Sequence, residues 1–519
     1  MKFSYEVEMR TKKNKIKKLR KYHKWPGLII AFILIYYAIS GILMNHRELI
    51  SNIDVNRSIL PKNYHYKNWN LAALKGSETI SPDSTLIYGN IGVWLTDSSK
   101  QNFKDFNQGF DPGIDKRKVF DVHQSSGNHL YAATLFGLYA FNREVEQWQK
   151  FELNSDIDRF VAVISKGDSI IAMNRSYIFV GKDLGLHTRF EKVQLKAPSN
   201  YEKKVGLFET VWQIHSGEIF GLPGKLFVDL MGILVIILSV TGILYFFFPK
   251  LIKRRKQKQK ETKKLVNTMR WSLNWHNKIG GWFIVFLVIL ASTGMFLRPP
   301  LLLTIAGSKI PAIKYSHLDQ ANPWYDDLRD IMYDDDKETY LLAGYKGIYH
   351  LKTLESTPRL FPVQPPVSVM GINVFEKFDR NSYLVGSFSG LFLWNPTNGW
   401  VYDFISKTPY RNNSSGRPFG AYAISGLLKG NNNQLYGVDY THGVFGLQKQ
   451  TKFPAMPENI LNKSPMSLWN LSLEIHTGRI FHFILSDFYI LLVPITGIVS
   501  LIVLISGYFM WKKRKNKKK

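Results

Sequence analysis

The chain has 519 residues, of which 45% are hydrophobic and 14% are aromatic, and its formal net charge is +28. A chain of this length can hold several domains and a large apolar core. Three segments, 10–24, 250–270 and 512–519, carry 25 of the 28 excess charges, so the remainder is nearly neutral. Because the charge is confined to short patches beside apolar segments, the pattern argues against a nucleic-acid-binding protein.

Four apolar segments follow along the chain, at 26–44, 226–248, 279–297 and 488–511. The first and third have 19 residues each without a charged side chain, the second contains only Asp229, and the fourth contains none. At about 1.5 Å per residue, helices of this length cross a hydrocarbon core of about 30 Å. We therefore predict four transmembrane helices. No small-residue cleavage site follows the first of them, so we expect it to be an anchor.

The basic patches predict the orientation of these helices, because segments rich in Lys and Arg stay cytoplasmic. The two long segments between helices must then lie outside, and the absence of cysteine is compatible with exported domains that do not need disulfides. The expected parts are a basic cytoplasmic N-terminus (1–25), a first transmembrane helix (26–46), an extracytoplasmic β domain (47–212), a second helix with an outer lead-in (213–249), a basic cytoplasmic loop (250–275), a third helix (276–297), a second extracytoplasmic β domain (298–472), a fourth helix with an outer lead-in (473–511) and a basic cytoplasmic tail (512–519).

The two halves of the chain repeat one another. His23 is followed by glycine after 4 and 18 residues, and His276 is followed by glycine at the same two distances. "IHSGEIF" at 214–220 resembles "IHTGRIF" at 475–481, and Gly232 with Gly242 corresponds to Gly497 with Gly507. Two halves of equal orientation predict a pseudo-twofold axis along the membrane normal.

The repeat predicts how four histidines are paired. His23 and His276 (the inner pair) have equivalent cytoplasmic depths, and His215 and His476 (the outer pair) have equivalent outer depths. A single histidine near the interface is more often a helix cap or part of an aromatic belt, but four histidines paired by a repeat favour a shared function.

Two imidazoles that converge from different helices inside a bilayer indicate a b-type haem, which needs an axial ligand on each face. Two such ligands leave no open iron position, which favours electron transfer over oxygen binding. Zinc is disfavoured because the sequence has no cysteine and no H-E-x-x-H motif. The glycines expected to give the macrocycle room between helices are Gly27, Gly41, Gly232, Gly280, Gly294 and Gly497.

The membrane segments resemble the PepSY-associated transmembrane family, which includes iron-regulated membrane proteins and di-haem siderophore-iron reductases of the bacterial inner membrane. The similarity is carried by "YHKWPG" with "ISG", "IHSGEIFG" with "DLMGILVIILSVTG", "WHNKIGG" with "STG", and "IHTGRIF" with "ITG". The resemblance implies two haems b, one near each membrane face. His23 and His276 would hold the inner haem, and His215 and His476 the outer one.

Further polar residues accompany the four histidines. His46 and His482 are additional candidates for the outer iron. However, six residues turn a helix by about 600°, so His476 and His482 face different directions and are not expected to share one haem. Asp229 and Asp487 lie near the outer ends of their helices, where an acid can orient an imidazole or simply sit at the interface. The cations that flank the outer face are Arg47, Lys225, Arg298 and Arg479. We expect them to pair with haem carboxylates, to attract an anionic chelate, or only to anchor the helices.

The two long outer segments read as β structure, because apolar runs alternate with turns that contain glycine. Three similar units recur in each half, for example "TLIYGNIGVWLTD" and "SYLVGSFSGLFLWNPTNGWVYDFI". Their spacing is typical of propeller blades, so we predict six blades in a split six-bladed β-propeller, with one antiparallel sandwich in each half as the alternative.

Two hypotheses for function remain. The first is a di-haem oxidoreductase of the bacterial inner membrane that passes electrons outward to ferric iron or a ferric siderophore. Since no nucleotide-binding loop is present, its electrons would come from a quinol or a separate reductase. The second is a haem-free sensor or scaffold whose outer domain binds a ligand or a partner protein.

Overall fold

The computed structural model describes residues 2–199, 201–410, 420–430, 434–448 and 452–515. The chain divides into two units, and both halves of the sequence contribute to each of them. The helical unit contains residues 1–50, 203–319 and 469–519. The β unit contains residues 51–202 and 320–468. The four boundaries of the β unit lie inside the outer segments predicted above, because residues 47–50, 203–212, 298–319 and 469–472 belong to the helical unit instead.

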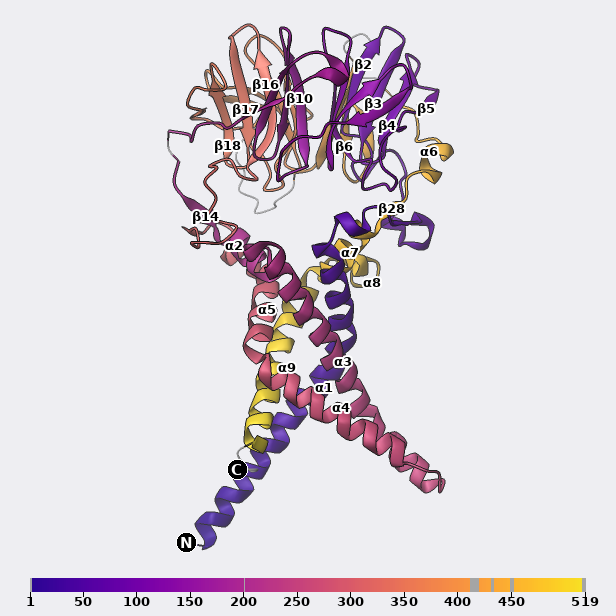
Figure 1. Cartoon of the computed structure of the whole chain (residues 1–519), viewed down its shortest axis with the longest axis vertical. Helices are drawn as coiled ribbons and strands as arrows, with labels where there is room; N and C mark the ends of the chain where they lie inside the picture. Colours follow the sequence, from indigo (N-terminus) through magenta and orange to yellow (C-terminus); the bar gives the residue numbers. More distant parts are fainter. Residues whose placement is uncertain (1, 200, 411–419, 431–433, 449–451, 516–519) are drawn as a thin grey trace. The chain divides into compact units, whose positions relative to one another are not determined.

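The helical unit is dominated by long helices (Figure 1). Its α-helices are α1 (Lys2–Asn45), α2 (Leu207–Ser216), α3 (Gly221–Gln257), α4 (Lys263–Trp282), α5 (Ile284–Phe296), α7 (Leu468–His476), α8 (His482–Leu485) and α9 (Leu492–Lys515). Its short 3-10 helices are η1 (Glu48–Ile50), η5 (Glu218–Phe220), η6 (Leu301–Thr304), η8 (Arg479–Phe481) and η9 (Ser486–Leu491), and β14 (Lys204–Gly206) pairs with β15 (Lys309–Pro311).

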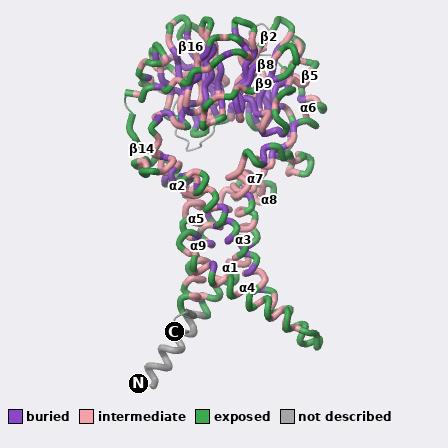
Figure 2. The backbone as a smooth tube through the Cα atoms, in the orientation of Figure 1, coloured by how far each residue is buried: buried purple, intermediate pink, exposed green. Residues whose placement is uncertain are grey.

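Among the described residues, three unbroken helical segments are long and apolar enough to cross a membrane: Lys17–Asn45, Glu218–Gln257 and Arg479–Lys513. Many of their apolar side chains are exposed, as lipid-facing side chains are, and Figure 2 shows few buried residues along these helices. The protein is therefore a membrane protein. A fourth span is present if α4 and α5 are counted together.

The third predicted span is not one straight helix. The chain bends by 72° between Lys263–Trp282 and Ile284–Phe296. The bend follows Gly280 and Gly281, which weaken a helix because glycine loses more backbone entropy than other residues. Gly281 also allows close packing, since a Cβ at this position would lie only 2.6 Å from the indole ring of Trp511. The 19-residue apolar run at 279–297 predicted the span, but it could not reveal this break.

Besides the two-stranded pair of β1 and β28, the described residues of the β unit form six antiparallel sheets in chain order, three from each half of the sequence (Figure 1). The first three are β2–β5 (Gly76–Ser81, Ser84–Gly89, Gly92–Asp97, Phe103–Asp105), β6–β9 (Val119–Gln124, Leu130–Thr134, Gly137–Asn142, Gln147–Lys150) and β10–β13 (Phe160–Lys166, Ser169–Asn174, Ile178–Lys182, Glu191–Val193). The other three are β16–β19 (Leu328–Asp334, Thr339–Gly344, Gly347–Leu351, Arg359–Leu360), β20–β24 (Ile372–Lys377, Tyr383–Ser387, Gly390–Asn395, Trp400–Asp403, Thr408–Pro409) and β25–β27 (Ile424–Lys429, Leu435–Asp439, Gly443–Gly446).

The first strands of the six sheets contact one another in sequence, and β25 of the last sheet contacts β2 of the first. A hydrophobic cluster fills each of the six spaces between consecutive sheets. Alternation along a strand sends neighbouring side chains to opposite faces. Leu86 therefore packs toward the second sheet, whereas Ile87 packs toward the sixth.

Small elements complete the β unit. They are β1 (Asp54–Val55), which pairs with β28 (Met466–Ser467), the helix α6 (Glu458–Asn462), and the 3-10 helices η2 (Arg57–Ile59), η3 (Lys62–Tyr64) and η4 (Gly185–His187). The β1–β28 pair joins the start of one chain half to the end of the other. The segment around Trp69 does the same, because its indole nitrogen donates to the carbonyl of Pro454 over 2.8 Å.

Candidate functional site: two pairs of histidines

The helical unit brings the four repeat-related histidines together as two pairs. In the inner pair, the ring centroids of His23 on α1 and His276 on α4 are 5.9 Å apart, with 86° between the ring planes. In the outer pair, the centroids of His215 on α2 and His476 on α7 are 6.0 Å apart, with 53° between the planes. Each pair therefore joins one histidine from each half of the chain.

Every one of these imidazoles is held through its Nδ1 atom by a helix from the opposite half. His23 Nδ1 lies 2.8 Å from the carbonyl oxygen of Val503 on α9. His476 Nδ1 lies 2.9 Å from the carbonyl oxygen of Tyr37 on α1. His215 Nδ1 contacts the carbonyl oxygen of Leu290 (3.1 Å) and Oγ1 of Thr293 (3.2 Å), both on α5. His276 Nδ1 contacts Oγ1 of Thr241 (2.9 Å) on α3.

These contacts determine the tautomer of the rings. A carbonyl oxygen can only accept, so the Nδ1 atoms of His23, His215 and His476 must carry the proton and donate it. For His276 the acceptor is a hydroxyl, and the hydroxyl hydrogen of Thr241 is already donated to the carbonyl of Ile237 at 2.6 Å. The Nε2 atom of each ring therefore keeps its lone pair. None of the four Nε2 atoms has a hydrogen-bond partner among the described residues.

A glycine lies against each imidazole. A Cβ on Gly507 would be 2.8 Å from Cε1 of His23, and one on Gly294 would be 2.7 Å from Cε1 of His215. The corresponding distances are 3.1 Å for Gly41 and His476, and 3.6 Å for Gly242 and His276. Three of these distances are shorter than an ordinary contact, so only glycine lets the ring reach the helix backbone there.

The same local element thus occurs four times, with a backbone carbonyl, a Ser or Thr three residues later and a glycine one residue after that. Its members are Tyr37–Ser40–Gly41, Leu238–Thr241–Gly242, Leu290–Thr293–Gly294 and Val503–Ser506–Gly507. We refer to it as the carbonyl–hydroxyl–glycine element. Successive turns of a helix bring these positions onto one face, which is why the spacing is constant.

Sequence reasoning missed part of this element. Gly41 and Gly294 are predicted site residues, and both lie against imidazoles. Gly242 and Gly507 also lie against imidazoles, but the sequence indicates them only as members of the repeat. The signal that could have found them is the recurrence of Ser–Gly or Thr–Gly at 40–41, 241–242, 293–294 and 506–507. The other predicted glycines face side chains that are not histidines: Gly27 faces Val503, Gly232 faces Ile42, Gly280 faces Leu238 and Gly497 faces Met295.

The structure does not bring His46 or His482 to the outer pair. His46 Nε2 lies 2.6 Å from Oδ2 of Asp229, whose other oxygen accepts from the amide of Asn45 at 2.9 Å. His482 Nε2 lies 3.8 Å from Oδ1 of Asp487, and its ring packs beside Tyr489. Asp229 and Asp487 therefore lie beside these two additional histidines, and neither is hydrogen-bonded to an imidazole of the outer pair.

The donor set of each pair fits one type of metal centre. The described residues contain no group of three or more His, Cys, Asp or Glu side chains that could hold a metal ion. Each pair offers only two nitrogen ligands, which suits a metal that brings its other ligands with it, as haem iron does. Metal–imidazole bonds of about 2 Å would put two rings that share one metal about 6 Å apart between centroids, and both pairs have this spacing.

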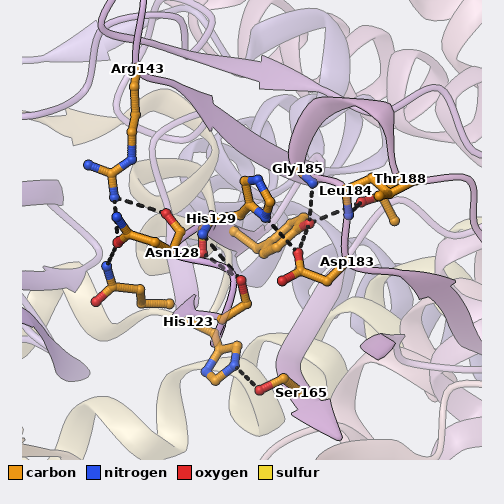
Figure 3. Close-up of polar contacts among 12 residues, drawn as sticks. His123, Asn128, His129, Arg143, Ser165, Asp183, Leu184, Gly185 and Thr188 are labelled. Carbon is orange, nitrogen blue, oxygen red and sulfur yellow. Dashed lines mark hydrogen bonds and ion pairs between the residues drawn. The ribbon is translucent and has the colours of Figure 1, made fainter. Parts of the chain in front are cut away.

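Histidines of the β unit are engaged in local networks instead (Figure 3). His129 Nδ1 lies 3.0 Å from Oδ1 of Asp183, which also accepts from the hydroxyl of Tyr131 at 2.7 Å. His123 Nε2 lies 2.9 Å from Oγ of Ser165. Both contacts join the β6–β9 sheet to the β10–β13 sheet, so they serve the packing of the two sheets.

The fold and the paired histidines define a class of protein: a membrane protein made of two repeats, with histidines from opposite repeats facing each other between its helices. The model of the PepSY-associated TM region matches residues 6–248 and 249–514. The chain belongs to this family.

Comparisons with individual proteins give less information about this chain than the family match does. No curated protein sequence matches the chain. The extracellular domain of BT4673 from B. thetaiotaomicron is similar in structure, with a TM-score of 0.35 and 11% identity over 76% of this chain and 34% of that one. The extracellular domain of BT3049 from the same organism has a TM-score of 0.34 and 10% identity over 73% of this chain and 39% of that one.

A third similar structure is the computationally designed Ika8 protein, with a TM-score of 0.31 and 8% identity over 73% of this chain and 98% of that one. The matches to the two extracellular domains span little more than a third of those chains. At these scores the similarities carry no statement about fold or activity.

Proposed function

We propose that the chain is a di-haem b membrane oxidoreductase, in which His23 and His276 hold one haem and His215 and His476 hold the other. The observation that carries this proposal is the fourfold carbonyl–hydroxyl–glycine element. It holds each ring through Nδ1 and leaves the Nε2 lone pair without a hydrogen-bond partner among the described residues. Aromatic packing alone also tolerates centroid distances of about 6 Å. Aromatic packing does not explain why each of the four rings has its proton on Nδ1 and its lone pair on Nε2.

Haem b would supply a one-electron carrier, and two histidine ligands for each haem would favour electron transfer over oxygen binding. The protein's own residues orient the four imidazoles, raise their basicity through the Nδ1 hydrogen bonds, and provide an apolar surround between helices. His23 and the Tyr37 carbonyl that holds His476 are 14 residues apart on α1. The two sites are thus separated by about 20 Å along that helix.

Two sites at different depths support electron transfer across the membrane. The basic patches favour a cytoplasmic location for both termini and for the 250–275 loop, so the inner pair would face the cytoplasm. We propose that electrons from a quinol or a separate reductase leave through the outer pair to an extracytoplasmic acceptor, with ferric iron or a ferric siderophore as the preferred candidate. The membrane would be the bacterial inner membrane.

We also propose that the β unit is a six-bladed β-propeller exposed outside the membrane. The closed order of contacts from β2 through β25 and back to β2 supports it, as do the six hydrophobic clusters between consecutive sheets. A pair of separate sandwiches, one in each half, would not contain the cluster that joins the third sheet to the fourth.

The test is the reduced-minus-oxidised absorption spectrum of the purified protein, together with its haem content. We expect low-spin haem bands and two haems per chain. His23→Ala or His276→Ala should remove about one haem, and the double variant should remove no more than one. The same holds for His215 and His476. His46→Ala and His482→Ala are matched controls, and both should keep two haems.

A protein purified without haem, which also fails to bind added haem, would favour the alternative of a sensor or scaffold. Full haem content in the His23→Ala/His276→Ala double variant would show that the inner assignment is wrong. To test direction, a ferric chelate too large to cross the membrane should oxidise the reduced protein in vesicles with the outer face exposed, and His476→Ala should stop this oxidation.

A further inference from the structure

Three buried polar atoms without partners belong to residues that are near the outer pair in the chain. Among the described residues, Nε of Arg298, Nε of Arg479 and Oε1 of Gln213 are buried and have no hydrogen-bond partner. Gln213 is two residues before His215, and Arg479 is three residues after His476. Arg298 is four residues after Gly294, the glycine that lies against His215. Each of the three is thus tied by chain position to a member of the outer pair.

The two guanidinium groups are within electrostatic range of one another. Burial lowers the pKa of Arg298, and the positive charge of Arg479 lowers it further. Glu474 and Tyr37 are within electrostatic range of Arg298 as well. The ring of Tyr37 lies 5.6 Å from that of His476, which places this group of residues beside the outer pair.

The available acid does not satisfy both arginines. Glu474 Oε1 accepts from Nη2 of Arg479 at 2.5 Å, and this is the ion pair that the structure gives Arg479. No described carboxylate forms an ion pair with Arg298. A buried charged donor left unpaired costs about 1–3 kcal/mol or more. The two Nε donors, on partly buried side chains within electrostatic range of each other, are therefore available to an anion.

The other two cations predicted at the outer face are engaged elsewhere. The guanidinium of Arg47 lies 3.8 Å over the ring of Trp469. Lys225 Nζ lies 3.1 Å from Oε1 of Glu218. Arg298 and Arg479 differ from them in having a buried Nε without a hydrogen-bond partner, a distinction that their chain positions could not provide.

We propose that Arg298 and Arg479 form a carboxylate-binding pair at the outer pair of histidines. Guanidinium groups bind carboxylates through short, charge-assisted hydrogen bonds, and two of them match a ligand with two carboxylates. Two sources share this chemistry, the carboxylates of a haem held by His215 and His476 and those of an anionic ferric chelate. The first source rests on the proposed function, whereas the second does not require bound haem.

The experiment compares Arg298→Gln, Arg479→Gln and the double variant with two controls, Arg47→Gln and Lys225→Gln. In the absence of any chelate, we measure the rate of haem transfer to apomyoglobin and the midpoint potential of each haem. Binding of ferric citrate, which carries carboxylates, is then compared with that of an uncharged ferric trihydroxamate. The haem of the inner pair is the control for correct folding. Arg298→Lys and Arg479→Lys replace the Gln variants if one of these fails to fold.

If Arg298 and Arg479 bind haem carboxylates, the outer haem should be lost about tenfold faster in the single Gln variants, since the loss of one charge-assisted hydrogen bond changes an affinity by about that factor. Its midpoint potential should also fall, because a positive charge nearby stabilises the reduced form. If Arg298 and Arg479 bind the chelate instead, haem retention should be unchanged. Ferric citrate should then bind about tenfold more weakly, and the trihydroxamate should bind as before.

Unchanged haem loss, potential and ferric citrate binding in the double variant would overturn the proposal. Equal effects in the Arg47→Gln or Lys225→Gln controls would overturn it too, because any outer cation would then suffice. A protein without haem would contradict the proposed function but not this inference, since the ferric citrate comparison would still decide whether the arginine pair binds carboxylates.

Discussion

At the scale of single residues, the glycines of the helical unit have different tasks despite similar spacing. Gly507 gives His23 access to the Val503 carbonyl, because a Cβ at this position would be 2.8 Å from the ring. Gly280 meets only a methyl group of Leu238, at an ordinary distance of 3.8 Å. A methyl group added at the first position must displace a ring, whereas one added at the second fits.

We therefore predict that Gly507→Ala lowers the occupancy of the inner haem, whereas Gly280→Ala leaves two haems bound. The displaced ring loses its hydrogen bond to the Val503 carbonyl, worth about 1 kcal/mol, so several-fold weaker haem binding is expected. Haem content and the redox titration of the two haems measure the effect. Equal occupancy in the two variants would contradict this role for Gly507.

At the scale of elements, the first strands of the β unit carry partly buried acids among their apolar side chains. Glu78 on β2 accepts from the backbone N–H of Gln124 at 2.8 Å, and Asp121 on β6 accepts from that of Val163 at 2.8 Å. Each contact joins one sheet to the next. Burial raises the pKa of Glu78 to about 7 and that of Asp121 to about 6.

These shifts predict how the stability of the β unit depends on pH. The folded protein holds the proton on Glu78 up to a pH of about 7, whereas the unfolded chain releases it near the ordinary value of 4.5. Folding therefore becomes less favourable as the pH rises through this range, and the loss persists above it. Asp121 contributes in the same direction, over a window that ends near pH 6.

Glu78→Gln keeps an acceptor oxygen but has no charge to bury. It should raise the midpoint temperature of unfolding by a few degrees at pH 8, corresponding to about 1–3 kcal/mol, and by much less at pH 4. Thermal unfolding followed by circular dichroism measures this difference. The exposed Glu144→Gln is the control and should change neither value. A variant that is destabilised equally at both pH values would show that burial of the charge is unimportant.

At the scale of the whole molecule, neither half of the chain contains a finished site. His23 is held by α9 and His276 by α3, so each half supplies the imidazole of one contact and the carbonyl–hydroxyl–glycine element of the other. The β unit also depends on both halves, because β10 contacts β16 and β2 contacts β25. The connection between the halves is the exposed segment near Lys260, between α3 and α4.

We predict that residues 1–259 or 260–519 expressed alone bind no haem, whereas the two fragments expressed together recover both haems. Proteolysis at an engineered site near Lys260 should leave the haem content of the assembled protein unchanged. Co-purification of the fragments and their absorption spectra test this. Haem bound by a single fragment would mean that a histidine pair can form within one half, contrary to the contacts seen.

The sequence alone was sufficient for features that depend on local composition and on repetition. Apolar length indicated membrane spans, alternating apolar residues indicated β structure, and the repeat indicated that His23 belongs with His276 and His215 with His476. Membership of the PepSY-associated family, which the motifs suggested, is confirmed by the match over both halves of the chain. These features can be read from sequence because each is determined by neighbours along one helix, one strand or one repeat.

Only the tertiary structure decided which groups meet across helices. It separated Gly507, which contacts His23, from Gly497, which contacts Met295, and it separated Arg298 and Arg479 from Arg47 and Lys225. It also placed a 72° break inside an uninterrupted apolar run. The reason is common to all three. A hydrogen bond, a ring against a glycine or a buried charge depends on the rotation of one helix relative to another, and packing between distant segments sets that rotation.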